Sequence, residues 1–149
     1  MAAGNWIVTT NARTRWAKGT WNMDSATMKC GLVTSTSNIS ASSTTWAGVT
    51  NEVANGNGYT TGGVTVDFSY SGTTTVAVSF VSNPEWIATG SGITFRWAVL
   101  YEASGDVLAF SLGNTAGGGT DVSVPSGYNL VINSSGTPNP AFTLTGAAS

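Results

Sequence analysis

The sequence predicts an all-β fold: an antiparallel β-sandwich or a jelly-roll-like barrel with one short N-terminal helix. Apolar and polar residues alternate over long stretches, these stretches are rich in β-branched and aromatic residues, and Gly, Ser and Asn separate them. Alternation with a period of two is typical of strands that bury one face. At 149 residues, the chain is expected to form a single domain over 1–149 with a core of its own.

Three segments alternate most clearly, at 64–70, 75–80 and 93–102, and each is expected to be a strand with one face in the core. Ser71-Gly72 is expected to turn the first segment into the second, and Ser104-Gly105 to turn the third into a further strand. Weaker strand patterns occur at 27–34, 107–112, 120–124, 128–132 and 141–145. Eight or so short strands joined by turns favour a sandwich or barrel.

A short helix is predicted within an N-terminal arm that spans 1–24. Thr10 or Asn11 can cap its first turn, and Gly19 can adopt the left-handed conformation that ends a helix. Arg13 falls in the first turn, where the helix dipole disfavours a cation.

A long polar loop is predicted over 35–63, because this stretch is rich in Gly, Ser, Thr and Asn. A loop of that length without secondary structure is uncommon in a compact domain, and is generally functional or partly disordered. We therefore expect it to contribute contacts with a partner.

The composition favours a protein that packs against copies of itself or against a larger body. Only 8% of the residues are charged and 41% are hydrophobic, whereas about a quarter of an ordinary soluble domain is charged. A surface of hydroxyls and amides has little repulsion to keep neighbours apart. The net charge of −2 argues against nucleic acid as a partner, which requires a basic surface. No membrane span or secretory signal is recognisable, so we expect synthesis in a cytoplasm and no membrane partner.

The residue types present exclude most routes to catalysis. The chain has no histidine, which removes the usual general base and the ordinary His/Cys zinc sites. Cys30 is the one cysteine, and we expect it to be a small buried hydrophobe. A pair of carboxylates could still act as in a glycosidase, but Asp67 and Glu102 fall on outward phases of predicted strands. We expect no enzyme, no cofactor and no metal site, although calcium needs only oxygen ligands.

The candidate partner-binding residues are aromatic or basic. Tryptophan is common at interface centres because it is large and rigid and keeps one N–H donor. The candidates are Trp6, Arg13, Arg15, Trp16, Trp21, Trp46 and Tyr59. For the aromatic residues burial in the core is an equally good interpretation, and for the basic cluster a solvated helix face is the simpler one.

Three stretches of the chain carry a family resemblance. They are Asn5–Thr14 followed by Gly19-Thr20 and Asp24, Tyr59–Val64, and Trp86–Thr94 followed by Ala98–Tyr101. Together they resemble a family of small structural proteins of tailed bacteriophages, foremost the capsid decoration (cement) proteins. The resemblance spans most of 5–112. It implies a virion protein, assembled in the bacterial cytoplasm, that binds the outer face of the major capsid protein shell as a homo-oligomer, with a trimer as one option.

Two alternatives to capsid decoration stay open. The first is a tail or fibre module that binds host-surface glycans, with Trp46, Tyr59 or Trp86 as exposed stacking platforms. The second is an enzyme with two carboxylates, which a hydrolase screen would detect. If the chain decorates capsids, segment 1–21 and the loop 35–63 are expected to carry the capsid or subunit contacts.

Overall fold

The computed structural model describes residues 4–113, 120–132 and 142–145. Over these residues the chain consists of antiparallel strands and one short α-helix, so the predicted all-β fold is confirmed. In chain order the elements are β1 (Ile7–Val8), α1 (Thr10–Ala17), β2 (Met28–Val33), the 3₁₀ turn η1 (Trp46–Gly48), β3 (Val64–Val66), β4 (Phe68–Ser71), β5 (Thr75–Phe80), β6 (Glu85–Ile87), β7 (Ile93–Phe95), β8 (Trp97–Glu102), β9 (Val107–Leu112), β10 (Val122–Val124), β11 (Asn129–Val131) and β12 (Phe142–Thr145). Ala141, expected in the last strand, lies outside the described residues.

Within the described part of the chain, the largest sheet has five strands in the order β1-β9-β8-β2-β3, all antiparallel to their neighbours. β8 pairs with β2 along its whole length, so that Cys30 lies opposite Leu100. A bulge interrupts the pairing of β8 with β9 between Leu100 and Tyr101. Because β8 has a paired strand on each side, it forms the rigid middle of the molecule.

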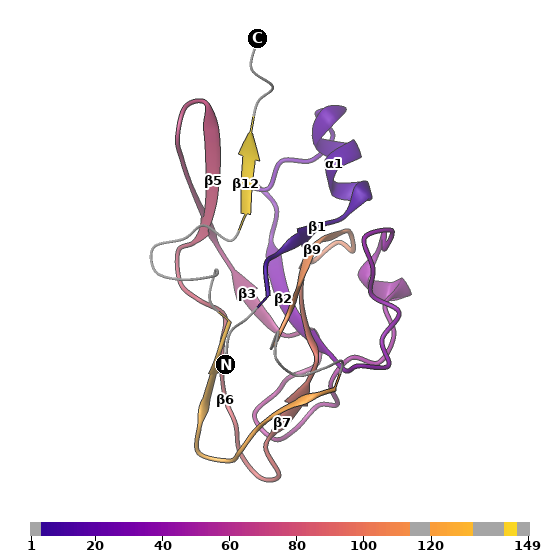
Figure 1. The fold of residues 1–149 in the computed structure, drawn as a ribbon, viewed down its shortest axis with the longest axis vertical. Coiled ribbons are helices and arrows are strands. Elements are labelled where there is room, and N and C mark those ends of the chain that lie inside the picture. Colours follow the sequence, from indigo (N-terminus) through magenta and orange to yellow (C-terminus); the bar gives the residue numbers. More distant parts are fainter. Residues whose placement is uncertain (1–3, 114–119, 133–141, 146–149) are drawn as a thin grey trace.

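Shorter antiparallel sheets form a second layer. In this layer β7 pairs with β10, β6 pairs with β11, and β5 lies between β4 and β12. Figure 1 shows β5, β6 and β12 along one side of the five-stranded sheet. Buried side chains from both layers form one core cluster, which includes Met28, Cys30, Leu32, Leu100, Val78, Trp86, Ile93, Phe95, Val122 and Leu130. The arrangement is therefore sandwich-like.

Two segments that the alternation predicts as continuous strands each change sheet at a corner. The segment 64–70 divides at Asp67, whose carbonyl accepts a hydrogen bond from Val81 N (2.9 Å). The segment 93–102 divides at Arg96, whose backbone N donates to Val33 O (2.7 Å). Single strands at these places were wrong predictions. In the segment 64–70 the same phase faces the core on both sides of the corner, since Val66 and Phe68 pack in one cluster. In the segment 93–102 the core-facing phase shifts at the corner, from Phe95 to Ala98.

The expectation that β8 buries only one face is also wrong. Ala98 and Leu100 lie in the core between the layers, whereas Val99 and Tyr101 lie in a second apolar cluster on the opposite face of the sheet. The segment 35–53, which includes η1, supplies side chains to this second cluster. A covered second face explains why the strand is buried on both sides.

The loop expected over 35–63 is thus folded onto the sheet. Isolated β-bridges join Val33 with Glu52 and Thr45 with Asp106. Asn38 binds the neighbouring backbone on both sides, since its Oδ1 accepts from Thr50 N (2.9 Å) and its Nδ2 donates to Gly48 O (2.9 Å). Side-chain amides and hydroxyls therefore satisfy a backbone that has little regular structure.

Both predicted hairpin turns are confirmed. Ser71-Gly72 connects β4 with β5, and Ser104-Gly105 lies between β8 and β9. Gly72 has φ +104°, and a Cβ atom built there would lie 1.9 Å from Thr75 O. This turn therefore requires glycine for both its conformation and its space.

The helix begins one residue before the sequence suggests. Thr9, and not Thr10 or Asn11, is its N-cap: the Thr9 hydroxyl accepts from Ala12 N (3.2 Å) and donates to Val107 O (2.8 Å). The cap therefore also connects the helix to β9. The sequence around Thr9 does not indicate this connection, because β9 is distant in the chain. Gly19, with φ +64°, follows the helix end as predicted.

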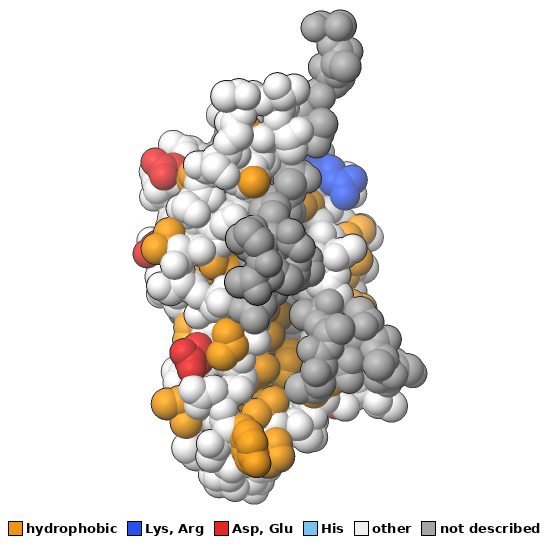
Figure 2. All heavy atoms as spheres, turned by 60° about the vertical axis from the view of Figure 1, so that its left-hand side comes forward, with side chains coloured by type: hydrophobic (Ala, Val, Ile, Leu, Met, Phe, Trp, Pro, Cys, Tyr) orange, Lys and Arg blue, Asp and Glu red, His pale blue; other side chains and the backbone are white. Residues whose placement is uncertain are grey.

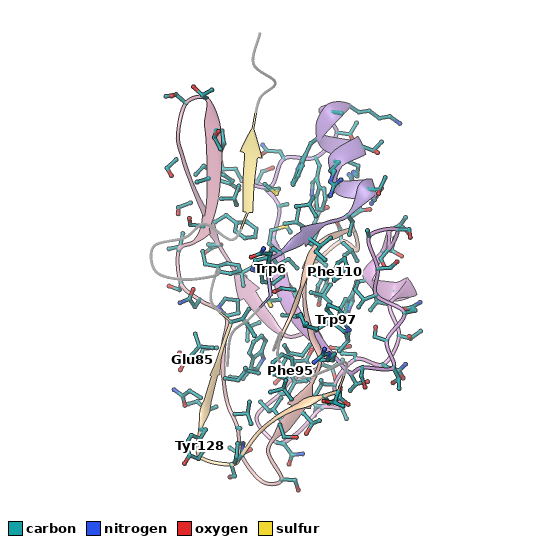
Figure 3. All side chains as sticks on the ribbon, viewed as in Figure 1. Trp6, Glu85, Phe95, Trp97, Phe110 and Tyr128 are labelled. Carbon is teal, nitrogen blue, oxygen red and sulfur yellow. The ribbon has the colours of Figure 1, made fainter. Side chains whose placement is uncertain are left out.

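The N-terminal segment expected as an arm is part of the central sheet. β1 pairs with β9, Gly4 N donates to Leu112 O (2.7 Å), and the Ser111 hydroxyl donates to Gly4 O (2.7 Å). Trp6 lies near the middle of the molecule (Figure 3), with its ring edge-on to Phe80 at 5.9 Å. This segment is therefore part of the folded core, and it stabilises the fold whether or not it also contacts a partner.

Candidate functional site

Four of the aromatic residues considered for partner binding lie in the core. Trp6, Trp21, Tyr59 and Trp86 are each at most 8% exposed. The expectation that Tyr59 or Trp86 could be an exposed stacking platform is therefore wrong, and Trp6 and Tyr59 present almost no surface to a partner. Their rings are large apolar bodies, and all four belong to the same buried core cluster.

Tyr59 is held by a buried polar network rather than by a ligand. Its hydroxyl donates to Glu52 Oε1 (2.7 Å) and accepts from Leu32 N (3.1 Å). Glu52 Oε1 also accepts from Gly62 N. Burial raises the pKa of Tyr59, and the neighbouring Glu52 carboxylate raises it further. This network anchors the end of the 35–63 segment on β2.

Cys30 is fully buried, as expected from its place in the strand pattern. Burial raises the pKa of its thiol, so the thiol stays protonated and unreactive. Among the described residues, no group of three or more Cys, Asp and Glu side chains is placed to hold a metal ion. No helix in the described ranges is both long and apolar enough to cross a membrane.

The two candidate arginines have different environments. Arg13 is exposed, and its Nη2 donates to Val8 O (2.9 Å). Arg15 pairs with Asp106 and lies 3.9 Å from Glu102 Oε2. The Arg15 guanidinium also lies 5.1 Å from the centre of the Trp21 ring. Arg15 is thus committed to intramolecular contacts, and Glu102 is partly buried rather than fully solvated.

Trp16 and Trp21 stack on each other beside an open groove. Their ring centroids are 6.3 Å apart with an interplanar angle of 27°. The groove has a volume of about 300 Å³ and is lined by Trp16, Trp21, Asn22, Met23, Asp24 and Tyr70. It brings two candidate residues from the N-terminal segment together with Tyr70 of β4, a residue that sequence reasoning did not single out.

Trp46 stacks on Tyr101, with ring centroids 4.3 Å apart and an interplanar angle of 5°. Its ring edge also lies over Gly31, where a built Cβ atom would approach Trp46 Cη2 to 2.7 Å. Trp46 is half-buried and packs against the second apolar cluster. One side of its ring is therefore occupied by the protein itself.

The surface that sequence reasoning missed is the outer face of β6 and β11, referred to below as the β6–β11 face. Ile87 and Val131 are 61% and 40% exposed, and Tyr128, immediately before β11, is 66% exposed. Trp86 and Leu130, on the opposite side of the same two strands, are buried. Figure 2 shows apolar side chains gathered on the lower part of the molecule. The pattern of Glu85–Ile87 is too short for periodicity to reveal which residues face outward.

Comparisons with known proteins return no match: no family model, no curated protein and no solved structure matches this chain. The resemblance to bacteriophage structural proteins therefore stays a prediction.

Proposed function

We propose that this chain is a non-enzymatic structural protein of a tailed-bacteriophage virion, which binds the outer face of the capsid shell and reinforces it as a homo-oligomer. The observation that carries the proposal is the β6–β11 face, where the side chains of Ile87, Tyr128 and Val131 are exposed on one side of a two-stranded sheet. Isolated exposed apolar residues are ordinary, but a group of them on one face is typical of an interaction site.

The electrostatics of this face suit a large protein partner. Glu85 is its charged residue, and its carboxylate accepts a hydrogen bond from Asn129 Nδ2 on the neighbouring strand. Few ions need to lose water when such a face is covered, so desolvation opposes binding less than it would at an ordinary surface. The charge-poor composition extends this property to the rest of the surface.

A small face is sufficient if attachment is multivalent. Covering one exposed Val, Ile or Tyr side chain contributes about 1–3 kcal/mol, which is modest for a single molecule. Copies joined as a homo-oligomer bind a lattice with a high effective concentration, so that weak contacts add up. The resemblance of the chain to capsid decoration proteins supports a capsid shell as that lattice.

The expected contacts of segment 1–21 need a revised test. Deleting these residues would remove β1, the Thr9 cap and part of the core, so loss of binding would not distinguish a missing contact from misfolding. Surface substitutions on strands avoid this ambiguity.

The proposal is tested by co-expressing the chain with the major capsid protein encoded in the same genome and measuring its occupancy on purified capsids. We expect the double variant Ile87→Thr and Val131→Thr to lower the affinity about tenfold or more, because two apolar contacts are weakened. Ile7→Thr is the matched comparison: Ile7 is an exposed strand isoleucine outside this face and inside segment 1–21, so its effect on occupancy tests the contacts expected of that segment. Full occupancy by the double variant, or no association of the unaltered chain, would contradict the proposal. Native mass spectrometry that shows monomers alone would remove its homo-oligomer component.

A further inference from the structure

The groove beside Trp16 and Trp21 lies far from the β6–β11 face. Figure 1 shows α1 and β5, the strand that pairs with β4, in the upper half of the molecule and β6 in the lower half. Tyr70 of β4 lines the groove, whereas Tyr128 lies at the lower end (Figure 3). A chain attached to a capsid by its β6–β11 face would keep this groove open to the medium.

The groove combines aromatic surface with polar groups that have no hydrogen-bond partner among the described residues. Asn22 Oδ1 accepts a hydrogen bond from Asp24 N (3.1 Å), which fixes the turn. Within the described residues, the Asn22 amide nitrogen, the Asp24 carboxylate and the Tyr70 hydroxyl form no hydrogen bond. The apolar part comes from Trp16, Trp21 and Tyr70, the last of which is 39% exposed.

A second hollow among the described residues shows why this combination is informative. It lies in the 35–63 segment and is lined by hydroxyls and one amide, without an aromatic ring. Its polar groups are largely paired with one another: Ser40 Oγ lies 3.2 Å from Ser42 Oγ, and Ser43 Oγ accepts from Ser40 N (3.0 Å). Those hydroxyls stabilise the loop, whereas the polar groups around Trp16 remain available.

The aromatic side of the groove is held in place before any ligand arrives. The Arg15 guanidinium covers the Trp21 ring at 5.1 Å from its centre and is itself paired with Asp106. Trp16 in turn stacks on Trp21. Because the rings are ordered in the free protein, binding loses little side-chain entropy.

Charge and size restrict the ligand. Asp24 is the charged residue of the lining, so it disfavours anionic ligands. Burial, and then the negative charge of Asp24, raise the pKa of Tyr70 above its ordinary value, so its hydroxyl is protonated and can donate at neutral pH. A volume of about 300 Å³ is at the lower end of the range for small-molecule sites, and accommodates one six-membered sugar ring with its substituents.

We propose that this groove binds the ring of a neutral hexopyranose at the end of an oligosaccharide. A pyranose presents an apolar face of C–H groups, which fits an aromatic surface, and a rim of hydroxyls, which can bond to Asp24, Asn22 and Tyr70. The proposal goes beyond capsid attachment, and it replaces the platforms at Tyr59 and Trp86, which are buried.

The test uses an array of oligosaccharides that end in glucose, galactose, mannose or N-acetylglucosamine, followed by calorimetric titration of each hit. We expect a dissociation constant in the range of about 1 mM for a single shallow groove, and weaker binding of oligosaccharides that end in sialic or glucuronic acid. Trp16→Ala is expected to reduce the affinity at least tenfold, and Asp24→Asn to reduce it less, because the amide keeps one acceptor.

A matched pair of tyrosine variants separates this proposal from the capsid proposal. Tyr70→Ala should weaken saccharide binding and leave capsid occupancy unchanged, whereas Tyr128→Ala should do the reverse. Near-ultraviolet circular dichroism checks that both variants are folded. The saccharide proposal is overturned if no neutral sugar binds, or if Trp16→Ala and Tyr70→Ala bind sugars as tightly as the unaltered chain does.

Discussion

Two stacked aromatic pairs in this molecule have opposite roles. Trp46 and Tyr101 lie parallel at 4.3 Å, and the edge of the Trp46 ring occupies the space over Gly31. Trp16 and Trp21 lie 6.3 Å apart at 27°, beside an open groove. The first pair joins a polar segment to the sheet, and the second borders an unfilled space. The neighbours of a tryptophan, more than the residue itself, determine whether it stabilises the fold or is available to a ligand.

The closed pair explains how a segment with little secondary structure stays folded. Trp46 is the largest apolar side chain that the 35–53 segment places against the sheet, together with Ile39 and Val49. Gly31 has no side chain, and this absence lets the ring approach the strand. Serine, threonine and asparagine then satisfy the backbone, but the apolar contact supplies most of the free energy of attachment.

The largest effect is expected when the closed pair is broken. Trp46→Ala should lower the free energy of unfolding by about 3 kcal/mol, toward the lower end of the range for loss of a buried aromatic side chain, because Trp46 is half-buried. Urea denaturation followed by far-ultraviolet circular dichroism measures it. Trp16→Ala serves as the comparison. If both variants lose the same free energy of unfolding, the Trp16–Trp21 pair stabilises the fold as much as the Trp46–Tyr101 pair does, which contradicts the comparison.

The sequence predicts the strands well because their alternation is local, and it fails where distant segments decide the structure. Asp67 and Arg96 look like ordinary strand residues, yet the chain changes sheet at both, because the partner of each half lies elsewhere. Nothing around Gly31 indicates that a tryptophan fifteen residues later covers it. Pairing of strands and covering of faces depend on tertiary contacts, which a single sequence does not display.

The candidate site is likewise predictable only in part, because residue type is visible in the sequence but tertiary contacts are not. Trp16 was selected for its residue type, and the structure places it at a groove. Tyr59 was selected by the same rule and is buried. Residue type measures how much a side chain gains when it is covered, but not whether the protein or a ligand covers it. Ile87 and Val131 were missed because their strands are only three residues long, which is too short for a period to identify the outer face.

Tyr101, the partner of Trp46 in the closed pair, makes the stability of the fold depend on pH. Burial is the main cause that raises the pKa of Tyr101 to about 12, with a further increase from the Glu52 charge. The folded state therefore keeps the Tyr101 proton at a pH where the unfolded state, with a pKa near 10, has lost it. This contribution is fully present below pH 10 and is lost as the pH rises to about 12, a loss of about 2–3 kcal/mol.

Urea titrations at several pH values between 9 and 12 measure this loss. Tyr101→Phe should reduce the decline in the free energy of unfolding at alkaline pH. The same variant lacks the hydrogen bond from Tyr101 to Gly62 O (2.7 Å), so at neutral pH its free energy of unfolding should be lower by about 1 kcal/mol. An unchanged alkaline slope in Tyr101→Phe would show that Tyr101 is not the group responsible.

The smallest effect on stability is expected at the open pair. Trp16→Ala should lower the free energy of unfolding by about 1 kcal/mol or less, because the side chain is only partly buried at the rim of the core and lines the groove. The same variant should lose saccharide affinity by at least tenfold, so its effect on binding is large where its effect on folding is small. Trp46→Ala should show the inverse, with a large loss of stability and saccharide binding retained at temperatures where it is folded. A loss of about 3 kcal/mol in Trp16→Ala would make the open pair structural, and the groove would then be a gap in the packing of the fold rather than a site.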